Sequence, residues 1–332
     1  MNTDGPGAGD AGMTAENETG PAHGPHPETY REGKLDVRRV ALISNPKAGK
    51  GRTGDKLAKA RNRLAELGVD VVHMQGSSPQ ASRELAAEAV ADDAIDVIAC
   101  CGGDGLVSLV LQEQAMSGKP IGIIPTGTGN DHAREHGIPL DPERAAETIA
   151  VGRFRTTDLG LMKGPGFEDH WFGTIAMAGF DSLVTERTNQ ISWPTGKSRY
   201  VAAIAIEFAK FHSLPARLVI ERDLVLDENL TMVAIGNTRT YGGGMKVCPT
   251  ADPTDGMLNV TVLKRLSRRR AAMKFPKIFT GDFLNEEGVS TFRASHISLR
   301  MDGVTAFADG DPVGPADFTV ECVPGAGCYI VP

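Results

Sequence analysis

The chain has few cysteines, few aromatic residues and no long apolar run. Five cysteines among 332 residues, none in a C-x-x-C pair, argue against a disulfide scaffold and indicate reduced thiols in a cytoplasmic protein. The apolar runs are far shorter than the ~20 residues of a membrane-spanning helix, so we expect no transmembrane segment. An excess of basic charge is also missing: the net charge of −7 disfavours a nucleic-acid partner.

Large apolar residues are nearly absent before residue 34, where Gly, Pro, Ala and acidic residues dominate. This stretch has neither the basic start nor the apolar middle of a signal peptide. We therefore expect a disordered tail over residues 1–35.

Strand and helix patterns alternate from residue 37 to about residue 150. Strands are expected at 37–45, 68–74, 97–101 and 120–125, with helices after each of them. This alternation predicts an α/β domain over 36–158 with a parallel sheet covered by helices.

The pattern changes after residue 158 to short strand-like runs broken by Gly and Pro. They lie at 171–180, 216–223, 231–237, 257–263, 296–301 and 318–323, with helical stretches only near 200–211 and 268–279. We expect a mainly antiparallel β-sandwich domain over 159–332, whose last residues could pack back on the first domain.

Glycine-rich loops follow three strands of the first domain. They read NPKAGKGR at 45–52, GGDG at 102–105 and PTGTGND at 125–131. Ligands of open α/β sheets lie beyond the carboxyl ends of the strands, so these loops should meet at one crevice. Glycine lets phosphate oxygens approach backbone amides, and the loops add lysine, hydroxyl and carboxylate groups. Together they predict a site for nucleotide phosphates and Mg²⁺.

Two other nucleotide motifs fit less well. Gly49, Gly51 and Gly54 form the G-x-G-x-x-G fingerprint, but 74–76 at the end of the next strand lacks the acid that would hold a ribose. The Walker A motif is not matched either, because it needs Lys and then Ser or Thr after its second glycine, and Gly54 is followed by Asp55 and Lys56.

The motifs resemble the diacylglycerol kinase catalytic-domain family, which includes soluble bacterial lipid kinases and sphingosine and ceramide kinases. NPKAGKG looks like the family's NPxSGxxxG, GGDGL like its GGDGT, and TGTGNDHAR like its GTxNDFAR. DLG at 158–160, GGGMKVCPTADPTDGML at 242–258 and DGD at 309–311 follow in the family's order, so the resemblance runs from residue 37 to the C-terminus.

The resemblance implies an ATP-dependent, Mg²⁺-dependent kinase that phosphorylates diacylglycerol or a related lipid at the membrane surface, from a cleft between two lobes. Catalysis would use Asp104, Asp131 and Asp158 to organise Mg²⁺ and Asp311 as the base that accepts the hydroxyl proton. Asp252, Asp255 and the carbonyl of Met257 would form a structural Mg²⁺ site; the alternative is an ordinary turn before Gly256. The nucleotide phosphates would contact Asn45, Pro46, Lys47, Ala48, Gly49, Gly102, Gly103, Asp104, Gly105 and Thr128.

Three departures from the family pattern bear on activity. The family has Glu where this chain has Asp311, Thr at Leu106 and Ser at Ala48. A carboxylate displaced by ~1 Å could cost about 10²-fold in rate. A catalytically degenerate nucleotide- or lipid-binding protein is therefore one alternative. An NAD kinase or sugar phosphate kinase is another, because those relatives share GGDG.

The sequence leaves the role of two further features and the oligomeric state undecided. The basic residues between 264 and 274 could attract anionic headgroups at an inner membrane face or be an ordinary solvated surface. His132 and His136 are spaced for a metal, but no third ligand is evident. The sequence does not reveal the oligomeric state; the bacterial relatives are dimers, which makes a homodimer a candidate.

Overall fold

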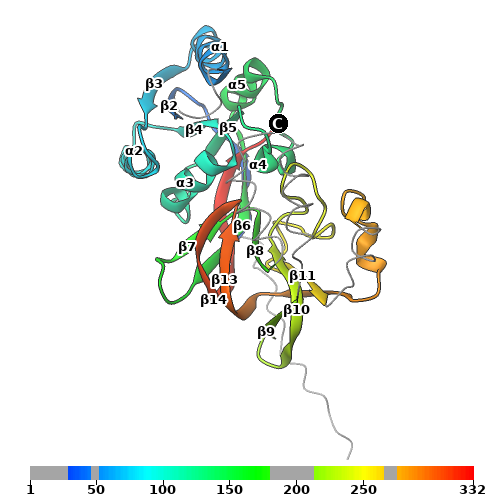
Figure 1. Ribbon diagram of the computed structural model, residues 1–332. Coiled ribbons are helices and arrows are strands. Elements are labelled where there is room, and N and C mark those ends of the chain that lie inside the picture. Colours follow the sequence, from blue (N-terminus) through cyan, green and yellow to red (C-terminus); the bar gives the residue numbers. More distant parts are fainter. Residues whose placement is uncertain (1–28, 46–51, 180–212, 265–274) are drawn as a thin grey trace, which may run out of the picture.

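The computed structural model describes residues 29–45, 52–179, 213–264 and 275–332 (Figure 1). The expected tail up to residue 28, the predicted helix at 200–211 and most of the one at 268–279 lie outside these ranges. Glu32–Lys34, which we had assigned to the tail, instead form β1 and pair antiparallel with β6 (Arg153–Lys163). Regular structure therefore begins earlier in the chain than the composition indicated.

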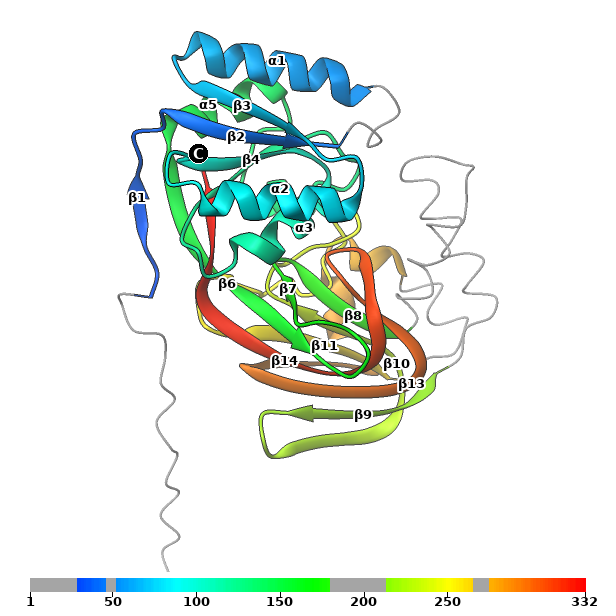
Figure 2. The same cartoon turned by 90° about the vertical axis from the view of Figure 1, so that its left-hand side faces the viewer.

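The first lobe is a four-stranded parallel sheet in the order β3–β2–β4–β5, with helices on both faces. The helices α1 and α5 pack together on one face, and α2 and α3 on the other (Figure 2). Every residue of β4 is buried, as expected for a strand covered on both faces. The elements are β2 (Arg39–Ser44), α1 (Arg52–Glu66), β3 (Asp70–Gln75), α2 (Pro79–Ala91), β4 (Val97–Gly102), α3 (Asp104–Gln114), β5 (Ile121–Pro125), α4 (Asp131–Glu135) and α5 (Pro142–Val151).

The second lobe is mainly antiparallel and rich in β structure, as the sequence predicted. The prediction of a single strand over 171–180 is wrong, because residues 173–174 separate two strands, β7 and β8. The 268–279 region contributes only a short 3₁₀ turn to the described chain. The elements are β7 (His170–Phe172), β8 (Ile175–Gly179), β9 (Leu214–Ile220), β10 (Leu224–Gly236), β11 (Leu258–Lys264), η1 (Phe275–Ile278), η2 (Asp282–Asn285), β12 (Val289–Ala294), β13 (His296–Ala308) and β14 (Asp311–Ile330).

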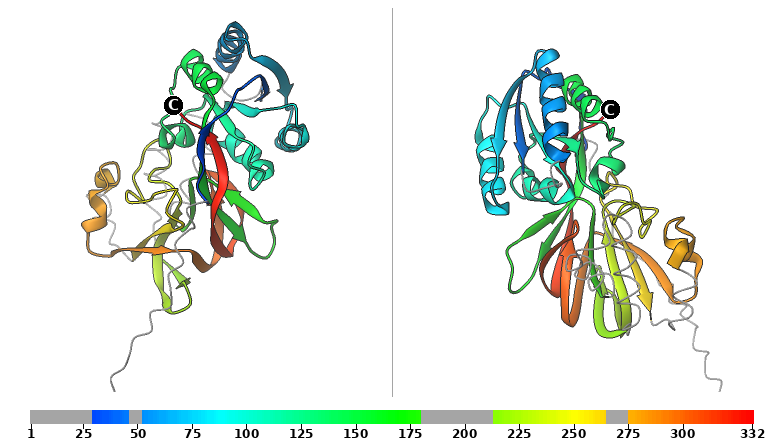
Figure 3. Two further views of the ribbon diagram at one scale, coloured as in Figure 1. Left: turned by 180° about the vertical axis from the view of Figure 1, so that it is seen from behind. Right: turned by 45° about the horizontal axis from the view of Figure 1, so that its top comes forward.

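The long strand β14 connects the two lobes. It pairs with β13 in the second lobe and with β6 along most of its length, and near its end Tyr329 pairs in parallel with Ile121 of β5 (Figure 3). The buried side chains of Tyr329 and Ile330 belong to the apolar core of the first lobe. One continuous sheet thus carries both lobes and sets their relative position.

None of the described helices is both long and apolar enough to cross a bilayer.

Candidate active site

Two of the glycine loops touch through their backbones. A Cβ atom on Gly103 would lie 3.2 Å from the Cα atom of Gly127, so side chains at this contact would force the loops apart. Asn130 stabilises the second loop from a left-handed conformation (φ 52°), and its side-chain amide donates to the carbonyl of Gly127 at 3.0 Å. At the start of α3, Gly103 provides no side-chain cap. The backbone there is open to an anionic ligand, which the positive end of the helix dipole would attract.

Asp104 and Asp131 approach each other across Gly129. A Cβ atom on Gly129 would lie 2.7 Å from Oδ2 of Asp104 and 3.3 Å from Oδ2 of Asp131. Both oxygens of Asp131 accept from the amide of Gly243, and its Oδ1 atom pairs with Arg134. Burial raises the pKa of Asp131, and repulsion from Asp104 raises it further. A divalent cation between the two carboxylates would relieve that repulsion, so these residues fit Mg²⁺.

Asp311 reaches this region from the second lobe. It is the first residue of β14, and its Oδ2 atom would lie 3.2 Å from a Cβ atom on Gly105, at the start of α3. Burial, Asp309 and Asp104, in that order, raise the pKa of the Asp311 carboxyl. The structure therefore brings three of the predicted catalytic carboxylates to the first turns of α3 and α4.

A cavity of about 530 Å³ opens at the same place. Leu106 and Leu109 of α3 contribute apolar surface to its wall. Leu106 packs closely on Gly102 and fills the position where the family has a threonine hydroxyl. The remaining lining residues are Asn45, Pro79, Gly103, Gly105, Ser108, Gln112, Thr126, Gly127, His170, Asp311 and Pro312.

The other predicted phosphate-binding residues fall into two groups. Asn45 lines the cavity, and Thr128 is exposed in the loop beside it. Pro46, Lys47, Ala48 and Gly49 lie outside the described residues. Lys56, which we had not selected, extends from α1 and donates to the carbonyl of Pro125 at 3.3 Å.

Asp158 lies elsewhere. Its buried carboxylate accepts from the Tyr30 hydroxyl at 2.6 Å, the Gly256 amide at 2.7 Å and the Gly325 amide at 3.3 Å. Burial raises its pKa to about 6, against the lowering effect of these hydrogen bonds. Its contacts in the described chain are with the N-terminal segment, β14 and the turn at 252–257, not with Asp104 or Asp131.

The turn at 252–257 contains the residues predicted to bind structural Mg²⁺. Asp252 accepts from the amide and hydroxyl of Thr254, and Asp255 accepts from the amide of Met257 and pairs with Arg293 at 2.5 Å. These contacts are those of an aspartate turn. Burial raises the pKa of Asp255, and the nearby Asp252 carboxylate raises it further, while Arg293 and the Met257 amide lower it. Across the described ranges, no cluster of three or more His, Cys, Asp and Glu side chains is arranged to hold a metal.

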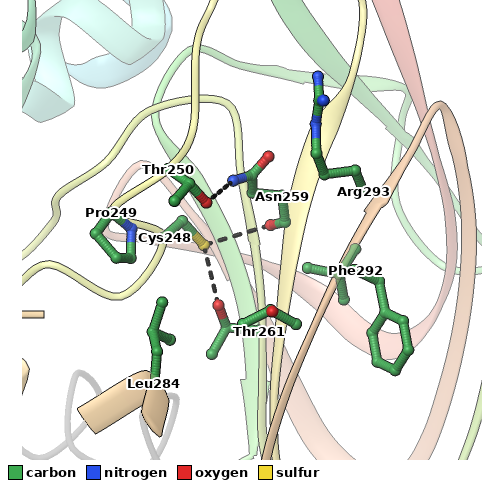
Figure 4. Close-up of a pocket in the computed structure, with 10 residues that line it drawn as sticks. Cys248, Pro249, Thr250, Asn259, Thr261, Leu284, Phe292 and Arg293 are labelled. Atoms are coloured by element: carbon green, nitrogen blue, oxygen red, sulfur yellow. Dashed lines mark hydrogen bonds between the residues drawn. The ribbon is translucent and has the colours of Figure 1, made fainter. Parts of the chain in front are cut away.

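A smaller cavity of about 180 Å³ lies beside this turn (Figure 4). The Cys248 thiol donates to the carbonyl of Asn259 at 3.3 Å, and the side-chain amide of Asn259 donates to Thr250 at 2.7 Å. Arg293, the partner of Asp255, lines the same cavity. None of the predicted catalytic residues contributes to its wall.

Asp309, to which the sequence analysis assigned no role, is completely buried beside the site. Its carboxylate accepts from the amide of Gly173 at 3.0 Å, the amide of Thr174 at 2.8 Å and the Thr174 hydroxyl at 2.5 Å. It also forms an ion pair with Nε2 of His132 at 3.5 Å. The DGD motif and His132 were both visible in the sequence, but nothing there indicated that they touch.

The two histidines considered as metal ligands have separate partners. Burial alone would lower the pKa of His132, but Asp309 raises it. His136 stacks on Tyr329 with ring centroids 4.0 Å apart, and burial lowers its pKa to about 3. His132 thus faces a carboxylate, whereas His136 packs on an aromatic ring.

Two family models cover nearly all of the described chain. Residues 39–162 match the diacylglycerol kinase catalytic domain, and residues 174–329 match the YegS C-terminal NAD kinase beta sandwich-like domain.

Curated relatives are similar over most of their length. A diacylglycerol kinase of Mycobacterium tuberculosis is 40% identical over 292 residues, which cover 88% of this chain and 94% of the relative. A probable YegS-like lipid kinase of Stenotrophomonas maltophilia is 31% identical over 314 residues, covering 90% and 99%.

A crystal structure of a diacylglycerol kinase from Bacillus anthracis superposes with a TM-score of 0.68. It is 20% identical and covers 90% of this chain and 98% of that one, so it supports the fold alone. Taken with the sequence relatives, the fold and site define a phosphotransferase with an alcohol acceptor. The chain belongs to the diacylglycerol kinase catalytic-domain family, as the motifs predicted.

Proposed function

We propose that this enzyme transfers the γ-phosphoryl group of ATP to the hydroxyl of diacylglycerol or a closely related lipid, in the cleft between the two lobes. The observation that carries the proposal is that Asp104, Asp131 and Asp311 gather at the first turns of α3 and α4, beside a cavity whose wall includes Asp311 and the glycine loops. Phosphoryl transfer depends mainly on positioning and charge neutralisation, and this arrangement can provide both.

The nucleotide phosphates would lie against the touching loops at 102–105 and 125–131. Gly103 and Gly127 leave the backbone uncovered, and the dipole of α3 favours negative charge at its first turn. Asn45 and Thr128 add polar side chains at the same edge, and residues 46–49 follow Asn45 directly in the chain.

Asp104 and Asp131 would hold Mg²⁺, which when bound neutralises charge on the phosphate oxygens. The Gly243 amide and Arg134 keep the Asp131 carboxylate in place. We propose a different role for Asp158, because in the described chain its carboxylate contacts Tyr30, Gly256 and Gly325 and neither Asp104 nor Asp131. It would support the catalytic half of the molecule by holding the turn at 252–257.

Asp311 would accept the proton of the acceptor hydroxyl. Its carboxylate lies beside Gly105 at the start of α3. Its raised pKa brings its proton affinity nearer to that of a working general base. The leucines of α3 that line the cavity suit an acceptor with an apolar chain, which would enter from a membrane surface.

The test is Mg²⁺-dependent transfer of labelled γ-phosphate from ATP to diacylglycerol in mixed micelles. We expect phosphorylated lipid from the wild-type protein and a loss of at least about 10³-fold with Asp311→Ala, which removes the base. Transfer only to NAD or to fructose 6-phosphate would contradict the lipid assignment. Tight ATP binding without transfer to any acceptor would instead indicate a degenerate kinase.

A further inference from the structure

The turn between β13 and β14 precedes Asp311, the proposed base, and is held by contacts with buried groups. Asp309 and Gly310 form a two-residue turn, with Ala308 paired to Asp311 across it. Both central residues have positive φ angles, 50° and 91°, as a type I′ turn requires. The orientation of the Asp311 side chain therefore depends on how this turn is held.

The Asp309 side chain points into the protein, whereas the side chain of such a turn residue usually faces solvent. Its side chain is 0% exposed, and it accepts hydrogen bonds from Gly173 and Thr174 in the segment between β7 and β8. The Asp309 amide donates to the carbonyl of Ile175 at 3.1 Å, which adds a backbone bond to the same segment. A buried carboxylate is tolerated only when its charge is compensated, so these contacts are strongly coupled.

The partner of the Asp309 carboxylate in the other lobe is His132. The His132 side chain is 1% exposed, and its Nε2 atom lies 3.5 Å from Oδ2 of Asp309. Its ring packs close to Gly173, where a Cβ atom would be 2.8 Å from Cε1 of the imidazole. A side chain at Gly173 would therefore displace the ring.

His132 also contacts the predicted Mg²⁺-binding carboxylates. Its backbone amide donates to Oδ1 of Asp104 at 3.2 Å, and it directly follows Asp131 in the chain. His132 therefore contacts Asp104 through its own main chain and the turn that carries Asp311 through its own side chain.

We propose that His132 is a positioning residue: through Asp309 it holds the turn that aims the Asp311 carboxylate at the acceptor hydroxyl. This inference rests on the proposed role of Asp311 as the base. It predicts that the His132–Asp309 pair controls kcat, because the pair holds the turn that carries Asp311. The KM for ATP should depend on it much less.

The test compares His132→Phe, His132→Gln and Asp309→Asn in the lipid kinase assay. Since a misplacement of ~1 Å can cost about 10²-fold in rate, we expect His132→Phe and Asp309→Asn to lower kcat about 10- to 100-fold. The KM for ATP should change less than about threefold, because ground-state binding of the nucleotide is retained. His132→Gln should recover part of kcat, since its amide can donate to Asp309.

The matched control is His136→Phe. This histidine lies one helical turn further on and stacks on Tyr329 without contacting Asp309, so its replacement by another ring should keep kcat near the wild-type value. Wild-type kcat in His132→Phe, or an unchanged kcat with a higher KM for ATP, would overturn the inference. Thermal melting verifies folding, and if His132→Phe does not fold, His132→Gln and Asp309→Asn decide the question.

The proposed function can fail separately. Wild-type protein without lipid kinase activity would remove the proposed function itself. An active wild type with an inactive Asp311→Ala and an unaffected His132→Phe would remove only the positioning role of His132.

Discussion

The backbone of Gly127 lies directly on that of Gly103, and a Cβ atom on Gly127 would be 2.6 Å from the Cα atom of Gly103. The same atom would be 2.9 Å from Oδ1 of Asn130, so it has no free direction. The two residues belong to loops that follow the neighbouring strands β4 and β5. Their contact sets the separation of the two loops proposed to hold the phosphates.

Gly127→Ala should therefore damage nucleotide binding. The new methyl group must push backbone against backbone, which typically costs about 1–3 kcal/mol in a packed region. We expect kcat/KM for ATP to fall at least about tenfold, since small displacements of positioning groups reduce rates steeply. Steady-state kinetics with ATP as the varied substrate, together with a melting curve, measures both effects.

Gly54→Ala is the matched control. Gly54 lies within α1, and a Cβ atom there would meet nothing within 4 Å. Alanine favours helix over glycine by up to about 1 kcal/mol, so this variant should melt at the same or a higher temperature. Equal kinetics for the Gly127 and Gly54 variants would show that the contact between the loops is not needed.

Asp311→Glu, which introduces the residue usual in the family, should lower activity in this chain. The Asp311 carboxylate already reaches the start of α3, with Oδ2 3.2 Å from the Cβ position of Gly105. An additional methylene would carry it past that point and misplace the base by about 1 Å, which can cost up to about 10²-fold in kcat. Measured kcat values for the wild type, Asp311→Glu and Asp311→Asn test this. A rate equal to or above wild type in Asp311→Glu would mean that the shorter side chain is the misplaced one.

Much of this architecture could be predicted because the information is local. Three of the four parallel strands of the first lobe, β2, β4 and β5, are short apolar runs that end at a glycine-rich loop, and the order of strands and helices follows from the alternation. The proximity of Asp104 to Asp131 also follows from a general rule, that loops after adjacent parallel strands meet at one sheet edge.

The contacts that the sequence did not indicate are long-range. Asp158 was assigned to Mg²⁺ on its motif alone, but its partners Tyr30 and Gly325 are separated from it by 128 and 167 residues. The pairing of His132 with Asp309 likewise depends on how β14 brings the two lobes together. Side-chain partners of this kind depend on tertiary packing, which periodicity does not describe.

Tyr30→Phe should destabilise the fold more at high pH than at low pH. The Tyr30 hydroxyl donates to the buried Asp158 carboxylate, whose pKa is raised from 3.8 to about 6. For a raised acidic pKa the folded state binds the proton more tightly, so this group's contribution to stability falls as pH rises through about 4 to 6. Removing the tyrosine donor raises the pKa further and extends that fall to higher pH.

We expect a loss of about 1.5–3 kcal/mol near pH 8, where the hydrogen bond is to a carboxylate, and about 1 kcal/mol near pH 5. Urea unfolding of the wild type and Tyr30→Phe at both pH values gives the two differences. The same loss at both values would show that Asp158 does not change its protonation state in this range. Tyr30→Phe keeps the aromatic ring, so a lost packing contact does not explain a difference.

The turn at 252–257 provides a separate test of the predicted structural Mg²⁺ site. If Asp252, Asp255 and the Met257 carbonyl bind Mg²⁺, the ion stabilises the folded protein by RT ln(1 + [Mg²⁺]/Kd), about 2.7 kcal/mol at 100 times Kd. Melting temperatures should then rise with Mg²⁺ in the wild type and in Asp131→Asn, which retains this turn. They should rise less in Asp252→Asn and Asp255→Asn. Arg293→Gln distinguishes the two readings of the turn: it frees the Asp255 carboxylate from its ion pair, so a real site should bind Mg²⁺ more tightly. If the turn is only an aspartate turn, Asp252→Asn, Asp255→Asn and Arg293→Gln should leave the Mg²⁺ dependence of melting unchanged.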